Sequence, residues 1–113
     1  MDEAAHAAHF TTVADAVGLR LRQIQAEVER VVPDARRCIG YKMPAFRRRR
    51  IFFYFAGFKQ HIGIYPPLSG PPELVAELAP WRGPKGNPAF PHKHPLPIDL
   101  IGRVAAALAE QYG

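Results

Sequence analysis

The sequence contains few of the side chains from which most catalytic centres are built. Cys38 is its only cysteine and Ser69 is its only serine. A single cysteine excludes an internal disulfide and a cysteine-based zinc cluster. Ser69 lies in a Gly-Pro turn, and no Gly-x-Ser-x-Gly or cysteine–histidine signature accompanies either residue. Nothing in the sequence therefore favours an enzyme.

Membrane and export signals are also missing. No apolar run approaches the roughly 20 residues that span a bilayer. The first ten residues, MDEAAHAAHF, begin with acids and have neither a basic region nor an apolar stretch of the secretory type. We therefore expect a cytoplasmic protein that does not associate with membranes.

Carboxylates are scarcer than bases. The 10 acids are outnumbered by 15 lysines and arginines, which gives a net charge of +5. Four of the bases form one run, Arg47, Arg48, Arg49 and Arg50, which we expect to be either an anion-binding site or a solubilising surface turn. The acids are scattered. The histidines occur in two pairs, His6/His9 and His92/His94, and the second pair lies in the proline-rich loop without a carboxylate or cysteine nearby. The sequence therefore predicts no metal ligands and no cofactor.

The hydrophobic pattern predicts an α+β domain. Apolar residues spaced by three and four predict a helix from Thr12 to about Val32, where Pro33 ends it. Strands are predicted at 37–46 (ended or interrupted by Pro44), 51–56 and 60–65, followed by a short helix, an extended piece at 88–90 and a C-terminal helix. Short connections favour a small antiparallel sheet with helices packed mainly on one face. Residues 1–12 are expected to lead into a single domain of residues 13–113.

The segment Ile51–Pro66, IFFYFAGFKQHIGIYP, is unusually rich in aromatic residues. A half-buried strand needs only one apolar face, and strict alternation places Phe52 and Tyr54 on the face opposite Phe53. This second face predicts a groove for a flat or anionic ligand with a basic rim. Its expected binding residues are Tyr41, Lys42, Phe52, Tyr54, Lys59, His61, Tyr65 and Lys85. A homodimer face, or a sheet covered by the proline-rich loop with Trp81 and Phe90, are the alternatives.

Four blocks of the chain resemble the YdhG-like family, a family of small bacterial proteins of unknown function. The blocks are IGYKMPAF (39–46), FYFAGFKQHIGIYP (53–66), KGNPAFP (85–91) and PLPIDLI (95–101). The sequence departs from the family pattern at residues 83–88, just before the extended piece. The resemblance implies a compact α+β fold, and one branch of the family is described as frataxin-like iron chaperones.

Together these features predict a non-enzymatic binding domain. Its expected partner is a small anionic or aromatic ligand, or another protein, held at the aromatic sheet face. An iron chaperone is an alternative implied by the resemblance alone, because the sequence shows no cluster of oxygen ligands that iron prefers. Weak nucleic-acid binding is a further alternative, because the run of four arginines adjoins an aromatic sheet.

Overall fold

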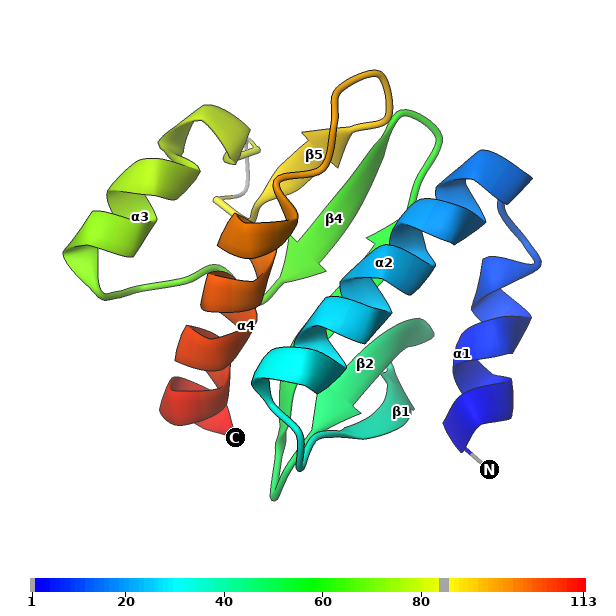
Figure 1. Ribbon diagram of the computed structural model, residues 1–113, viewed down its shortest axis with the longest axis horizontal. Coiled ribbons are helices and arrows are strands. Elements are labelled where there is room, and N and C mark those ends of the chain that lie inside the picture. Colours follow the sequence, from blue (N-terminus) through cyan, green and yellow to red (C-terminus); the bar gives the residue numbers. More distant parts are fainter. Residues whose placement is uncertain (1, 84–85) are drawn as a thin grey trace.

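The chain folds into a five-stranded antiparallel sheet whose strands follow one another in sequence order, β1-β2-β3-β4-β5 (Figure 1). The computed structural model describes residues 2–83 and 86–113, with side chains from residue 6 onward. Its elements are α1 (Asp2–Phe10), α2 (Asp15–Val31), β1 (Arg36–Gly40), β2 (Met43–Arg47), β3 (Ile51–Gly57), β4 (His61–Tyr65), α3 (Pro72–Leu78), the short 3-10 helix η1 (Ala79–Trp81), β5 (Ala89–Pro91) and α4 (Ile98–Tyr112). The expected α+β class is confirmed.

Helices α1, α2 and α4 cover one face of the sheet, and α3 flanks α4 (Figure 1). The core lies between these helices and the sheet. Its large, fully buried side chains come from both layers: Leu21, Ile24, Phe46, Phe53, Phe55, Ile62, Ile64, Phe90, Ile101 and Leu108. Burying each such side chain contributes about 1.5–3 kcal/mol. No described helix covers the opposite face, which we call the open face.

The predicted strand at 37–46 is wrong in one respect, because the chain reverses within it. Tyr41 and Lys42 have φ angles of 51° and 62° and form a tight turn between β1 and β2. Two successive positive φ angles match the twist of a β-hairpin, but such turns usually contain Gly, Asn or Asp. Pro44 lies within β2, opposite Ile39, and does not end the strand.

A register shift between β2 and β3 changes which side chains of β3 face the helices. Phe46 pairs with Phe53 and Arg47 with Ile51, so Phe52 is the extra residue of a β-bulge. Phe52 is completely buried beside Gly113, at the end of α4. The alternation that placed Phe52 with Tyr54 is therefore wrong, because the bulge turns Phe52 towards the helices. Ile51 moves to the open face, where it and Tyr54 border Gly40.

The N-terminal segment, expected to be a lead-in, contains α1, which packs on β1 and β2. His6 and Phe10 are buried on this helix. Phe10 contacts the ring of Phe55 from β3, with the ring centroids 6.1 Å apart. Residues before position 13 therefore contribute to the core.

The described helices are short compared with a bilayer. The longest, α2, has 17 residues, and none of the helices is long and apolar enough to cross a membrane. Cytoplasmic localisation stays a prediction.

Candidate functional site

The open face carries aromatic side chains from neighbouring strands. Tyr54 of β3 lies opposite Tyr65 of β4 on one side and Ala45 of β2 on the other. Directly opposed residues of antiparallel strands point to the same face, so these three side chains share it. Ala45 and Ala56 are buried on the same face, so the residues beside the tyrosine rings are small.

Gly63 leaves room for a ring above β4. A Cβ atom at this position would come within 2.9 Å of the Tyr65 hydroxyl oxygen and 3.1 Å of Phe58 Cε2. Such distances are below ordinary contact, so only glycine permits this arrangement. Phe58 also stacks on His61, with ring centroids 5.1 Å apart and an interplanar angle of 28°. Three rings therefore gather around Gly63.

A groove of about 900 Å³ lies beside these rings, along β4 and β5. Tyr65 and His61 line one part of it, and Ala89 and Pro91 provide apolar surface from β5. The residues Gly83 and Asn87 before β5 also line the groove. Trp81 packs against Phe90, with centroids 5.3 Å apart, and Phe90 pairs with the buried Ile62. The pair Trp81–Phe90 therefore belongs to the helix side and does not cover Tyr54 and Tyr65.

Three lysines lie at one end of the sheet. Successive hairpins of an antiparallel meander alternate between its two ends, so the β1–β2 turn, the β3–β4 turn and the loop after β5 share an end. Each carries one exposed lysine: Lys42, Lys59 and Lys93. Among the described residues, none of these three ammonium groups has a hydrogen bond or an ion pair. This lysine end is therefore available to an anion, and Lys59 and Lys93 both line the groove.

Tyr41 and Tyr54 form a second aromatic pair, outside the groove. Their ring centroids are 5.5 Å apart, and Tyr41 is 83% exposed. Burial raises the pKa of the Tyr54 phenol, and the neighbouring Tyr41 and Cys38 raise it further. The phenol of Tyr54 therefore stays protonated at neutral pH and can donate a hydrogen bond.

The structure brings together only part of the predicted ligand-binding set. Lys59, His61 and Tyr65 line the groove. Tyr41 and Tyr54 lie on the open face outside it, and Lys42 lies in the β1–β2 turn. Phe52 is buried in the core. Lys85 lies outside the described residues. Ligand binding by these residues stays a prediction.

The arginine run lies at the end of the sheet opposite the lysines, where Arg47 ends β2 and Arg48, Arg49 and Arg50 form the β2–β3 turn. Arg48 donates a hydrogen bond from Nη2 to the carbonyl oxygen of Ala109 in the last turn of α4, at 3.0 Å, and lies 3.7 Å from a carboxylate oxygen of Asp34. A cation at this place also stabilises the negative end of the helix dipole. Arg47 donates to the carbonyl oxygen of Arg49 at 3.0 Å. Arg48 therefore has a structural contact that the sequence did not reveal, while the anion-binding role predicted for the run stays a prediction.

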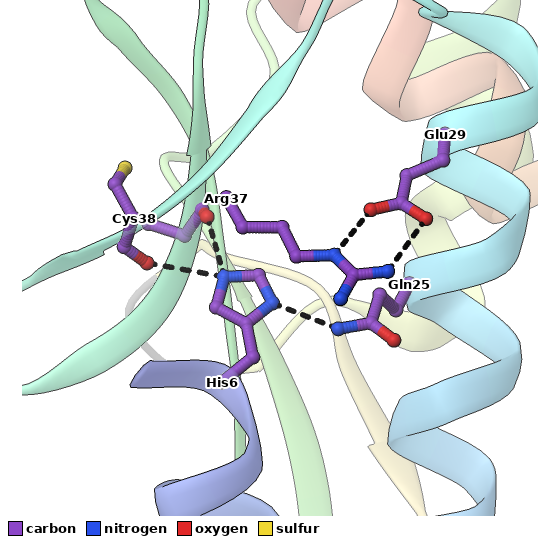
Figure 2. A network of polar contacts seen from close by, with 6 residues as sticks. His6, Gln25, Glu29, Arg37 and Cys38 are labelled. Carbon is purple, nitrogen blue, oxygen red and sulfur yellow. Dashed lines mark hydrogen bonds and ion pairs between the residues drawn. The ribbon is translucent and has the colours of Figure 1, made fainter. Parts of the chain in front are cut away.

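His6 joins α1 to the sheet through a polar network (Figure 2). Its Nε2 lies 2.8 Å from the carbonyl oxygen of Ala45 and 3.1 Å from that of Cys38. Because carbonyl oxygens only accept, Nε2 carries the proton, and Nδ1 accepts from the Gln25 amide at 3.0 Å. Burial lowers the pKa of His6, although the two carbonyl bonds oppose this effect. Figure 2 also shows the ion pair of Arg37 and Glu29, 2.5 Å apart, beside this network.

His9 makes a comparable contact about one turn further along the same helix. The backbone N–H of Gly57 donates to its Nε2 at 3.2 Å, so this nitrogen is unprotonated. Burial lowers the pKa of His9, and neighbouring His6 lowers it further. Within residues 2–83 and 86–113, no three histidines, cysteines or acids are grouped as metal ligands.

The distribution of acids along the sequence indicates where the cationic surface lies better than the arginine run does. No Asp or Glu occurs from residue 35 to 72 or from residue 78 to 98, the two segments that contain all five strands and their turns. The described carboxylates lie instead on α2, α3, α4 and the residue Asp34. The strands and their turns therefore carry cations at the ends of the sheet and no acids.

Comparison with known proteins supports the fold. The structure is similar to the crystal structure of YdhG from Bacillus subtilis, a protein of the DUF1801 family, with a TM-score of 0.72 and 14% sequence identity over 89% of this chain and 85% of that one. The predicted YdhG-like fold is thus confirmed. No family model matches the sequence, and no curated protein matches it either.

Proposed function

We propose that the protein binds a small anion carrying a flat apolar part in the groove along β4 and β5. The supporting observation is that Lys59 and Lys93 meet Tyr65 and His61 around a hollow of about 900 Å³. Ligand pockets commonly have volumes of roughly 300–1,000 Å³ and combine apolar walls with a few polar groups. The lysines attract the anionic group, and the rings offer a surface for the flat part.

His92 adds a polar group to the same groove. Its Nε2 donates to the carbonyl oxygen of Phe58 at 2.6 Å, which fixes the tautomer and leaves Nδ1 as an acceptor. This Nδ1 is buried and has no partner among the described residues. Because this nitrogen has almost no accessible surface, a ligand in the groove meets the His92 ring rather than this acceptor.

The test is a thermal-shift screen of small aromatic phosphates and carboxylates, followed by calorimetry. Uridine monophosphate and benzoate serve as probes, with pyrophosphate as an anion without a ring. We expect saturable binding of a ring-bearing anion and a loss of about tenfold in affinity for the Lys59→Ala/Lys93→Ala double variant. A tenfold loss corresponds to about 1.4 kcal/mol.

Lys42→Ala is the matched control, because Lys42 lies at the lysine end but outside the groove. Its affinity for these small probes should equal that of the parent protein. Equal binding by the double variant, or binding that Tyr65→Ala and His61→Ala both leave unchanged, would contradict the proposal.

The homodimer, protein-partner and iron-chaperone roles gain no specific support. Sedimentation tests for a homodimer at the open face. If one forms there, substitution of the open-face tyrosines should change the oligomeric state. The iron-chaperone role rests on the family resemblance alone. A calorimetric iron titration with saturable, stoichiometric binding would favour it over the groove proposal.

A further inference from the structure

We infer that the open face binds single-stranded nucleic acid, with unpaired bases stacked on its two groups of rings. The inference deepens the proposed function, on which it rests, by naming the ligand class. A small ligand in the groove uses Tyr65 and its neighbours but leaves the pair Tyr41–Tyr54 without a role. Both groups lie on one sheet face, on the side turned away from the viewer in Figure 1.

The spacing of the rings suits successive bases. Tyr54 and Tyr65 occupy opposed positions on adjacent strands, and their rings lean apart, one towards Gly40 and the other over Gly63. The buried residues beside them on this face, Ala45 and Ala56, are small, so they leave the two rings exposed to a ligand on one side. Four-stranded sheets that bind RNA stack two or three bases on such rings. Aromatic stacking tolerates any base, because every base has a flat face.

The charge of the face fits a chain of phosphates. The lysine end supplies Lys42, Lys59 and Lys93, which have no partner among the described residues. At the other end Arg36 and Arg47 lie directly opposite each other on the open face, and both are exposed. Opposed like charges destabilise a sheet, and no carboxylate from a strand or hairpin offsets this pair. A polyanion that crosses the rings from one end to the other neutralises both groups of cations.

A single strand fits this face better than a duplex. Stacking requires unpaired bases, and the rings lie on a sheet rather than on an element that could enter a groove. Binding through phosphates also releases counterions, so affinity must fall as salt rises. Salt dependence therefore separates this mode from a purely apolar contact.

Fluorescence anisotropy with labelled U10 and dT10 tests the inference, with uridine monophosphate as competitor. We expect both oligonucleotides to bind at least tenfold more tightly than the mononucleotide. Two arms, RNA and DNA, show whether the 2′-hydroxyl contributes. Tyr41→Asn, which suits the positive φ of this residue, and Tyr54→Ala should each weaken oligonucleotide binding roughly tenfold.

Charge variants provide the second readout. Arg36→Ser and Arg47→Ser should each reduce the slope of log affinity against log salt by about 1. Lys42→Ala should weaken oligonucleotide binding although it leaves mononucleotide binding unchanged. Arg22→Ser and Tyr112→Ala are controls on α2 and α4, away from the open face, and should have no effect.

Each remaining outcome overturns the inference. If the mononucleotide binds through Lys59 and Lys93 and the oligonucleotides bind no more tightly, the inference of single-strand binding is wrong. The proposal of small-anion binding in the groove is then retained. If neither binds, both proposals fail. If Tyr41→Asn and Tyr54→Ala dissociate a dimer instead, the open face binds a second copy of the chain.

Discussion

The Nε2 atom of His6 on α1 donates a hydrogen bond to the carbonyl oxygen of Ala45 in β2, at 2.8 Å. This contact joins residues 39 positions apart and holds the first helix on the edge of the sheet. It requires a neutral imidazole, because Nδ1 at the same time accepts from Gln25.

The first prediction concerns the stability of the fold in acid. Burial lowers the pKa values of His6 and His9 in the folded protein below the ordinary value of 6.5. As pH falls through 6.5, the unfolded chain therefore binds protons that the folded chain does not, and the free energy of unfolding decreases. Stability should be fully present above pH 6.5 and fall below it, as measured by urea unfolding at several pH values.

His6→Gln should flatten this pH dependence, because it removes one of the two titrating groups. His94→Gln is the control, since His94 is an exposed histidine in the loop after β5. If the free energy of unfolding falls equally steeply with pH in the parent protein and in His6→Gln, His6 does not contribute to the pH dependence.

The second prediction concerns the close approach of Gly63 and Tyr65. Gly63→Ala forces the Tyr65 ring from its position, because the new Cβ would lie 2.9 Å from the hydroxyl oxygen. We expect a loss of about 1–3 kcal/mol in the free energy of unfolding. In a Tyr65→Ala background the same substitution should cost much less, which a double-mutant cycle measures. Additive costs would show that the ring does not depend on Gly63.

The third prediction distinguishes two neighbouring arginines. Arg48→Met removes the hydrogen bond to Ala109 at the end of α4 and should lower the free energy of unfolding by about 1 kcal/mol. Arg49→Met changes the same charge at an exposed position and should change stability little. Urea unfolding of both variants at neutral pH compares them, and equal stabilities would contradict the capping role of Arg48.

The fourth prediction concerns the contact between α2 and α4. A Cβ atom at Gly102 would overlap the side chain of Glu27, which is buried and bonded to Arg30 at 2.7 Å. Gly102→Ala should therefore lower the free energy of unfolding by about 1–3 kcal/mol. The cost should largely disappear in a Glu27→Ala background, since the three nearest atoms that the new methyl group meets all belong to Glu27. Thermal unfolding of the parent protein and the three variants of this cycle tests the contact.

Several elements could be predicted because their signals are local. The three- and four-residue spacing of Val17, Leu21, Ile24 and Val28 follows the turn of a helix, and α2 forms there. The hairpin of β3 and β4 follows from two apolar strands around a short turn with glycine. The site residues Lys59, His61 and Tyr65 come from this hairpin, and one short segment brings them together.

Other features could not be predicted because distant contacts decide them. Tyr41 and Lys42 adopt positive φ angles without the usual glycine or asparagine, and the pairing of β1 with β2 holds them there. Phe52 turns towards the core because a bulge shifts its register against β2. Neither the positive φ angles nor the bulge can be recognised from the order of apolar and polar residues.

The sequence by itself determined the α+β class, the aromatic hairpin and the absence of acids from the strands and their turns, because these depend on residue type and short-range spacing. Only the tertiary structure decided which rings lie on the open face, that the three lysines share one end, and that His6 and Arg48 join helices to the rest of the fold. Those relationships depend on register and on chain segments far apart in sequence, and the packing energy of the whole domain selects them.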